Sequence, residues 1–300
     1  MENPANRSKA RGKKLAITIF LNLLITAAQA VGGVISGSLS LLSDALHNLS
    51  DVISLVISYV ANLLIRKKAT FTRTFGFKRA EILAALINST ILLSVSILLI
   101  FRAIQRLDDP SPIGSVWVMA LAGLGIVVNS LSAWLLYKDS RKNLNIRSAY
   151  LHLFTDTMTS VAVLAGGIVM YHTGYYQIDS ILTIVIGIYL FYHAWRILTG
   201  SLRILMLYAP LSVEIEKIIS RVKKIGGVEN IHHIHVWQVN EEQVHLEAHI
   251  DFTQNLTLSQ TGKIIRQIEE LLKGSFGIDH VTLQPEFNVQ DPKDAVRQEF

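Results

Sequence analysis

Two histidine–aspartate pairs occur at the same spacing in this sequence. His47 and Asp51 lie four residues apart in the apolar run 38–65, and His152 and Asp156 repeat that interval in a later apolar run. Residues four apart lie on one face of an α-helix. Two such helices present two imidazoles and two carboxylates, a tetrahedral set that suits Zn²⁺ better than Ca²⁺ or Mg²⁺, whose sites use more oxygens. These four residues are therefore the candidate ligands of one ion.

Asp44 and Asn48 lie on the same stripe of the first run as His47. The run is long enough to span a bilayer, where a carboxylate at the centre costs roughly 2.5–3.5 kcal/mol on insertion scales. Such side chains face a protein interior or a water-filled cavity and carry function. The alternative is that each His–Asp pair only hydrogen-bonds within its own helix, and the repetition of the pair favours the shared ion. Asp44 and Asn48 then line the path to the ion or hydrogen-bond its ligands.

The composition is that of a membrane protein. Half of the 300 residues are hydrophobic, and the mean hydropathy is +0.38, which soluble domains seldom reach. The chain has no cysteine, so disulfides and thiolate metal sites are excluded. Any metal ligands must then be His, Asp or Glu side chains. The net charge is +5, and many of the basic residues lie at the ends of the apolar runs. We therefore expect a lipid bilayer as a partner, and no nucleic acid.

Six apolar runs are each long enough, at about 1.5 Å per residue, to cross the hydrocarbon core. The expected fold is an α-helical membrane protein with a six-helix transmembrane bundle. Basic residues cluster on one side of this bundle, with five at 7–14, six at 66–79 and four at 138–147. The positive-inside rule places both termini in the cytoplasm. The predicted spans are 15–35, 42–65, 81–103, 115–137, 148–171 and 178–198.

Other polar residues within the predicted spans need partners. Asn22, Gln29, Asn88 and Asn129 are expected to hydrogen-bond between helices, which is ordinary in membrane bundles. Asp179, at the start of the sixth run, is expected either to face the bundle in the same way or only to cap that helix.

The chain changes character after Pro210, where a small domain with the order αββαβ is predicted. Ser212 is expected to cap its first helix, and Thr257 with Gln260 forms a capping box for its second. This order indicates an α+β domain with helices on one face of a sheet. The polar face of the second strand either binds metal or is a solvated surface that binds nothing. The predicted elements are helices 212–225 and 257–273 and strands 232–239, 244–251 and 281–284.

Three segments carry a resemblance to a known family: Ser43–Asp51, Phe75–Glu81 and the pair His152 and Asp156. They are similar to the signature segments of the cation diffusion facilitator family, in its zinc-transporting His-Asp branch, and the likeness covers nearly the whole chain. The resemblance implies a homodimeric exporter of cytoplasmic Zn²⁺ with a metallochaperone-like cytoplasmic tail. Zinc is then the transported substrate and, in the tail, a structural or sensing ion.

The resemblance also implies a tail metal site. His232 and His249 match two of its ligands, and Gln284 and Glu286 fall where its last ligands come from. We therefore expect His232, His249 and Glu286 to bind metal. The sequence departs from the family pattern in two places. In the tail, Gly262 stands where some members have a further histidine, so a complete binuclear site is not expected. In the second loop Thr70, Arg73 and Phe77 occupy places where some members bind zinc, so no metal is predicted there.

The expected division is a basic cytoplasmic N-terminus at 1–14, a transmembrane domain at 15–206 and a cytoplasmic domain for metal binding and dimerisation at 207–300. The loop 138–147 contains no histidine-rich insert, which favours a bacterial-type protein of the inner (plasma) membrane.

The chain offers no phosphate-binding loop, so an ion gradient is the expected energy source. Imidazoles bind zinc only when neutral, so metal binding competes with protons and Zn²⁺/H⁺ antiport is expected. An intramembrane metal hydrolase is disfavoured because no His-Glu-x-x-His segment is present, and we expect no enzyme. The alternative is a membrane-bound metal sensor that binds zinc without transporting it.

Overall fold

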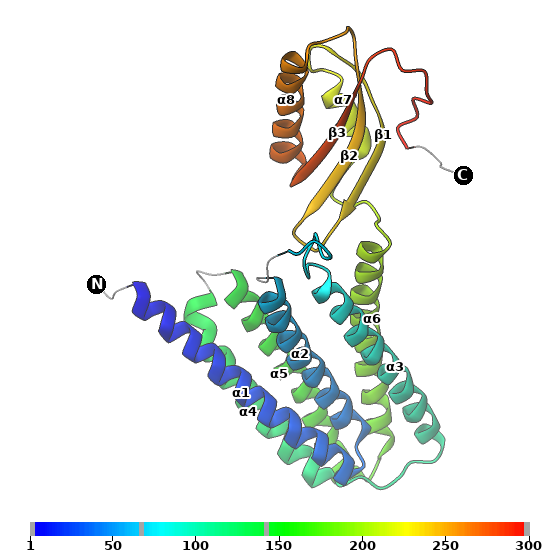
Figure 1. Cartoon of the computed structure of the whole chain (residues 1–300). Helices are drawn as coiled ribbons and strands as arrows, with labels where there is room; N and C mark the ends of the chain where they lie inside the picture. Colours follow the sequence, from blue (N-terminus) through cyan, green and yellow to red (C-terminus); the bar gives the residue numbers. More distant parts are fainter. Residues whose placement is uncertain (1–3, 66–68, 141–143, 297–300) are drawn as a thin grey trace. The chain divides into compact units, whose positions relative to one another are not determined.

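The computed structural model describes residues 4–65, 69–140 and 144–296 (Figure 1). Six long helices precede a small domain of helices and strands, so the expected element classes are confirmed. Residue contacts divide the chain into two compact units, 1–60 with 85–198 and 61–84 with 199–300. The long helices are α1 (Pro4–Ser36), α2 (Leu39–Ile65), α3 (Ala80–Asp108), α4 (Ser115–Ser140), α5 (Leu144–Thr173) and α6 (Gln177–Leu205).

Four helical stretches of the described residues are long and apolar enough to cross a membrane. They are Ala80–Asp108, Ser115–Tyr137, Leu153–Thr173 and Gln177–Leu205, and α1 adds a shorter apolar stretch, Phe20–Ser36. Several side chains in the second half of α2 lie outside the described residues, so its membrane span stays a prediction.

The six helices bury polar side chains and expose large apolar ones. Val34, Trp134 and Val185 are 73%, 73% and 61% exposed, whereas Gln29 and Asn48 are 0% and 1% exposed. Water would penalise this arrangement, because exposed apolar area costs free energy there. Lipid favours it, because the polar groups then find partners inside the bundle.

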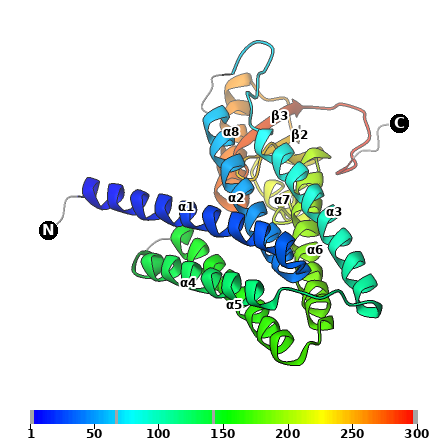
Figure 2. The same ribbon diagram turned by 90° about the horizontal axis from the view of Figure 1, so that it is seen from below.

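Glycines let the helices approach one another closely. A Cβ on Gly187 of α6 would lie 2.6 Å from the Ile100 side chain of α3, and one on Gly125 of α4 would lie 2.9 Å from Gln29 Nε2 of α1. The α1 and α4 helices run side by side in both views of the ribbon (Figures 1 and 2). Close backbone approach at small residues is the usual way in which membrane helices pack.

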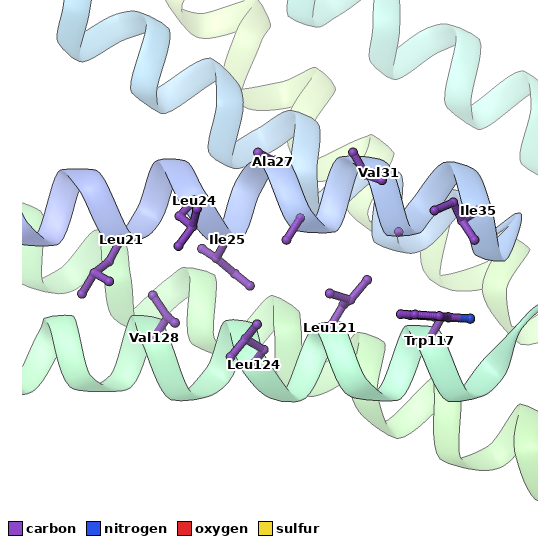
Figure 3. A pocket seen from close by; sticks show the side chains of 12 residues that line it. Leu21, Leu24, Ile25, Ala27, Val31, Ile35, Trp117, Leu121, Leu124 and Val128 are labelled. Carbon is purple, nitrogen blue, oxygen red and sulfur yellow. The ribbon is translucent and has the colours of Figure 1, made fainter.

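The outer face between α1 and α4 is hollowed into an open pocket of about 580 Å³. Leu24, Ile25 and Leu121 are among the side chains that line it, and Figure 3 shows Ile25 and Leu121 between the two helices. Its lining includes no carboxylate and no imidazole. This pocket therefore suits an acyl chain and is no site for a cation.

Asp179 makes the expected bond between helices and does not follow the alternative of capping its own helix. It lies in the first turn of α6, but its carboxylate accepts hydrogen bonds from Ser38 Oγ (2.6 Å), Leu39 N (2.8 Å) and Ser40 N (3.2 Å). Asp179 thus caps α2 and not its own helix. The reason is that the first N–H groups of α2 have no partner within that helix, and a carboxylate at a helix N-terminus is also favoured by the helix dipole.

The tail domain, as we call the part from α7 to β3, has the predicted αββαβ order. Its elements are α7 (Ile215–Val222), β1 (Val228–Gln238), β2 (Val244–Phe252), α8 (Leu258–Phe276) and β3 (His280–Glu286). The sheet order is β1-β2-β3, with β1 and β2 antiparallel and β2 and β3 parallel. Ile218 of α7, Leu246 of β2 and Ile268 of α8 share one buried core, so the helices cover the apolar face of the sheet.

The helix boundaries in the tail confirm one cap and contradict another. The Thr257–Gln260 capping box is present, and Gly277 ends α8 in the left-handed conformation. Ser212 is not the cap of α7, whose N-cap is Glu214 without a side-chain hydrogen bond. The chain is still turning at Ser212, because Val213 N donates to Pro210 O at 3.1 Å.

Strand β1 begins at Val228, four residues before the predicted start, directly after Gly227 with its φ of +92°. Its pairing with β2 is interrupted between His232 and His235, and His233 has a φ of +50°. This irregularity is a bulge, a feature that re-aims side chains.

Candidate metal centres

The structure brings three of the four predicted membrane ligands together. His47 and Asp51 face the same side of α2, with 3.6 Å between His47 Nδ1 and Asp51 Oδ2. Asp156 of α5 approaches the other ring nitrogen, with 3.6 Å between its Oδ1 and His47 Nε2. His47 and Asp156 are 3% and 0% exposed. We call these three residues, with the predicted fourth ligand His152, the membrane site.

His152 lies in α5, one helical turn before Asp156. Its side chain lies outside the described residues, so its part in the membrane site stays a prediction. The spacing of four residues that places Asp51 beside His47 also applies to His152 and Asp156.

A polar network lies one turn along α2 from His47, at Asp44. The Asp44 carboxylate accepts from Gln29 Nε2 of α1 at 2.9 Å and from Ser160 Oγ of α5 at 3.2 Å. Asn48 Nδ2 donates to Gln29 Oε1 at 3.2 Å. Asp44 is completely buried, so these bonds offset the cost of removing it from water. They also tie three helices together beside the membrane site.

The sequence placed Asp44 and Asn48 on the stripe of His47 but missed Ser160. The signal for Ser160 was available, because it follows Asp156 by the same four residues that separate Asp156 from His152.

Two of the four amide side chains make the expected bonds between helices. Gln29 bonds to α2 as described, and Asn88 Nδ2 of α3 donates to Ser50 Oγ of α2 at 3.1 Å. Asn22 and Asn129 are buried as expected. Among the described residues Asn129 has no hydrogen-bond partner, and nothing in the structure explains its burial.

A second cluster lies on the polar face of the tail sheet, where neighbouring strands align its members. His232 of β1 pairs in register with His249 of β2, and Asp251 of β2 pairs with Glu286 of β3. His249 Nδ1 lies 2.7 Å from Glu286 Oε1, and His232 Nε2 lies 3.5 Å from Glu286 Oε2. The structure therefore brings together all three predicted tail ligands.

The segment after β3 adds two residues that the sequence did not single out. Asp291 Oδ2 lies 3.3 Å from His232 Nε2, and Asp291 Oδ1 contacts the ammonium of Lys293. Lys293 Nζ also lies 2.8 Å from Asp251 Oδ1 and 3.2 Å from Glu286 Oε2. We call His232, His249, Glu286 and Asp291 the tail site.

Charge pairing at this cluster shifts two pKa values. Burial alone would lower the pKa of Lys293, but the hydrogen bonds to Asp251, Asp291 and Glu286 outweigh it and raise that pKa well above its usual value. The hydrogen bond from Lys293 lowers the pKa of the Asp291 carboxyl. Both groups are therefore charged at neutral pH.

Among the described residues, two groups place potential metal-ligating atoms within 4.8 Å of one another. They are His47 with Asp51 and Asp156, and the four members of the tail site. Imidazole and carboxylate groups at such spacing suit Zn²⁺ and its neighbours among the divalent transition metals. In the tail site His249 Nδ1 and Glu286 Oε1 lie 2.7 Å apart, so the strands bring these two potential ligands to one place.

The loop before α3 has a different construction. Thr70 and Arg73 exchange two backbone hydrogen bonds in a tight turn, and the Arg73 guanidinium lies 4.8 Å from the centre of the Phe77 ring. This is a cation–π contact between Arg73 and Phe77. The predicted absence of a metal from this loop stays a prediction.

Comparison with protein families matches two consecutive parts of the chain. Residues 15–206 match the family described as "Cation efflux transmembrane domain". Residues 210–287 match the family described as "Cation efflux protein, cytoplasmic domain".

Curated proteins similar along nearly the whole chain are named as metal transporters. A "Cadmium, cobalt and zinc/H(+)-K(+) antiporter" of Bacillus subtilis is 35% identical, covering 97% of this chain and 94% of that protein. A "Metal cation efflux system protein CzcD" of Cupriavidus metallidurans is 32% identical over 96% and 90%. A "Zinc transporter ZitB" of Escherichia coli is 36% identical over 86% and 82%.

Proposed function

The chain belongs to the cation efflux family of integral membrane transporters, and we propose on that premise that it exports Zn²⁺ from the cytoplasm in exchange for protons. One observation carries the proposal. His47 is buried between carboxylates from two different helices, Asp51 of α2 and Asp156 of α5. A site divided between two helices can open and close when the helices shift.

The ligand set supports the choice of cargo. Two carboxylates carry a formal charge of −2, which a divalent cation neutralises, and the imidazole favours a transition metal over Ca²⁺ or Mg²⁺. The names of similar proteins include cadmium and cobalt beside zinc. The same nitrogen and oxygen ligands accept these ions, so we expect a range of divalent cargo with zinc as the principal one.

The chemistry of imidazole supports coupling to protons. A histidine binds metal only as the neutral ring, and an unperturbed imidazole has a pKa of about 6.5, close to physiological pH. Metal and protons therefore compete for the same atoms. Facing an acidic exterior the site takes up protons and releases the cation, and facing the cytoplasm it loses protons and binds the cation again.

The neighbouring network supports the site without binding the ion. Gln29, Asn48 and Ser160 hydrogen-bond to Asp44 or to one another, and they join α1, α2 and α5. We propose that Asp44 holds these three helices in register. We propose His152 as the fourth ligand of the site that this network borders.

The placement in the cell follows from the charge pattern and the relatives. We propose a multi-pass protein of the bacterial inner membrane with both termini in the cytoplasm, because the basic segments 7–14, 66–79 and 138–147 alternate with loops poor in Lys and Arg. The proposed domains are 1–14, 15–206 and 207–300. A homodimer is proposed from the family of the tail domain, with tail-bound zinc as a structural or sensing ion.

The sensor alternative has one observation in its favour, the tail site, which is a second cluster able to hold an ion. A sensor binds zinc without moving it, whereas a transporter moves it across a sealed membrane. Vectorial flux therefore separates the two functions.

The test uses inside-out vesicles that contain the protein and a trapped zinc-sensitive dye. Zinc uptake should accelerate when the lumen is acidic, and protons should leave the lumen as zinc enters. A proton ionophore with the membrane potential clamped should remove the acceleration. A rate of zinc uptake that does not change with the pH difference would contradict proton coupling but not transport. Zinc binding without uptake would contradict transport and favour the sensor.

A further inference from the structure

We propose that Asp291 is the fourth metal ligand of the tail site, that Lys293 positions it, and that metal binding thereby fastens the segment 287–296 to the tail sheet. This inference deepens the proposed function, since it rests on the tail domain binding the same class of cation. The segment lies beyond the family match, which ends at residue 287. The segment therefore lies outside the matched domain.

The spacing of the candidate ligand atoms fits a tetrahedral ion. Ligand atoms about 2.0 Å from Zn²⁺ in a tetrahedron lie about 3.3 Å from one another. His232 Nε2 is 3.3 Å from Asp291 Oδ2 and 3.5 Å from Glu286 Oε2. His249 Nδ1 of the neighbouring strand lies closer, 2.7 Å from Glu286 Oε1, and all four residues offer ligand atoms within 4.8 Å of one another. Among the described residues the cluster without Asp291 keeps His232, His249 and Glu286, and a structural zinc site uses four ligands.

Lys293 has a different part, because an ammonium group cannot bind a cation. It contacts Oδ1 of Asp291 and of Asp251, while Oδ2 of each carboxylate faces a nitrogen of His232. Lys293 thus turns both carboxylates toward the imidazole. Outer partners of this kind orient metal ligands and are worth about 10–100-fold in affinity.

The charges of the cluster leave room for a divalent cation together with Lys293. Asp251, Glu286 and Asp291 carry three negative charges, and the ammonium offsets one of them. A divalent ion neutralises the remaining two, so Lys293 need not leave when metal binds. This charge balance argues against an arrangement in which Lys293 and metal exclude each other.

Backbone hydrogen bonds join the segment to the sheet. His233 N donates to Asp294 O at 3.1 Å, and Ile234 N donates to Ala295 O at 2.8 Å. Strand β1 is an edge of the sheet, so these N–H groups have no strand partner on that side. Because Asp291 and Lys293 precede these contacts by a few residues, an ion held by Asp291 also holds the segment along β1.

The experiment measures zinc binding by the full-length protein in detergent, with Asp51→Asn and Asp156→Asn present throughout to remove the membrane site. Competition with a chromogenic chelator gives the zinc Kd. The Asp291→Asn change should raise that Kd about 100-fold or more, beyond the loss of an outer partner. Lys293→Met should raise it about 10-fold, and Lys293→Arg should restore most of it. Asp294→Asn is the matched control, because it removes the same charge from the same segment.

A second readout follows the segment itself. Zinc should slow amide hydrogen exchange at Ile234 in the parent protein and should have no such effect in Asp291→Asn. A chain that ends at Phe287 should bind zinc as weakly as Asp291→Asn does, which keeps the test valid if one substitution perturbs folding.

Two results would overturn the inference. One is an Asp291→Asn protein that binds zinc as tightly as the Asp294→Asn control. The other is faster exchange at Ile234 when zinc is added, which would show Lys293 and the segment being expelled. Flux is measured separately with the membrane site intact, so loss of the transport proposal and loss of this one are distinguishable.

Discussion

The membrane site and the tail site offer the same kinds of ligand on different supports. The membrane site joins α2 and α5, and the network beside it pairs the Asp44 carboxylate with the uncharged side chains of Gln29 and Ser160. The tail site lies across three hydrogen-bonded strands and has the ammonium of Lys293 beside it. The surroundings of the ligands therefore differ more than the ligands themselves.

This difference indicates what each site is able to do. Strands joined by ladder hydrogen bonds keep their register, since a slip moves every side chain to the other face. Helices in a bundle are joined by side chains alone and can shift by 1–2 Å or rotate as units. The proposed transport site therefore lies on elements that can shift, and the proposed structural site lies on elements that keep their register.

The largest expected effect concerns the membrane ligands. Asp51→Ala and Asp156→Ala should each reduce zinc flux to below about a tenth of the parent rate, because residues acting as one unit fail together. For the same reason the double variant should be no worse than either single one. Zinc uptake into sealed vesicles is the measurement, and Asn22→Ala is the control for a buried polar residue outside the site. A single variant that retains more than this flux would show that the carboxylates do not share an ion.

The next effect concerns stability and the contact between α2 and α6. Asp179→Ala leaves Leu39 N and the Ser38 and Ser40 hydroxyls of α2 without their acceptor. We expect a loss of about 2 kcal/mol or more, since hydrogen bonds to charged groups contribute about 1.5–3 kcal/mol each and buried groups left unpaired add to the cost. Thermal unfolding in detergent measures it, with Asp108→Ala at the exposed end of α3 as control. An unchanged midpoint would show that the helices hold this end without the carboxylate.

A smaller effect on flux is expected from the tail. His249→Ala should weaken zinc binding by the tail domain but leave transport in place, with a changed dependence of the rate on zinc concentration. The reason is that His249 is a proposed ligand of the tail site, where its partners are Glu286, His232 and His233. Flux and tail zinc content are measured on the same vesicles. Complete loss of flux in a folded His249→Ala protein would show that the roles of the two sites are reversed.

The sequence predicts features that depend on neighbours along the chain. The apolar runs indicate the six helices because each is about the length of a bilayer span, and the four-residue spacing places Asp51 beside His47. The capping box at Thr257 and Gln260 is equally local, and it is confirmed. Ser212 fails as a cap because the turn at Pro210 continues past it.

The missed features join residues that lie far apart in the chain. The sequence allows Asp179 to bond between helices, but nothing near it indicates that its partners are Ser38 and the start of α2. The pairing of Gln29 with Asp44 depends on how α1 packs on α2. Asp291 and Lys293 follow the last strand in a segment without periodicity, so their return to His232 is visible only in the folded chain.

The smallest expected effect concerns pH and the opposite end of the tail sheet. The ring of His245 of β2 lies 4.8 Å from that of His280, 5.6 Å from that of Trp237 and 5.8 Å from that of Phe75. Burial lowers the pKa of His245, the nearby His280 and Lys78 lower it further, and Asp279 opposes them. The fold therefore favours the neutral ring over the protonated one.

The sign of the pH effect follows from this shift. In the unfolded chain a histidine has a pKa of about 6.5, so the unfolded state takes up a proton first as the pH falls. The stabilisation from neutral His245 is fully present above that pH and is lost as the pH falls through the lower pKa of the folded state. The tail domain should therefore be less stable at low pH, and His245→Gln should reduce this loss. Amide exchange in β2, measured at neutral and mildly acidic pH with a chelator present, tests the effect, and His172→Gln in α5 is the control. Equal pH dependence with and without His245 would show that the tail site, and not this ring cluster, governs the response of the domain to acid.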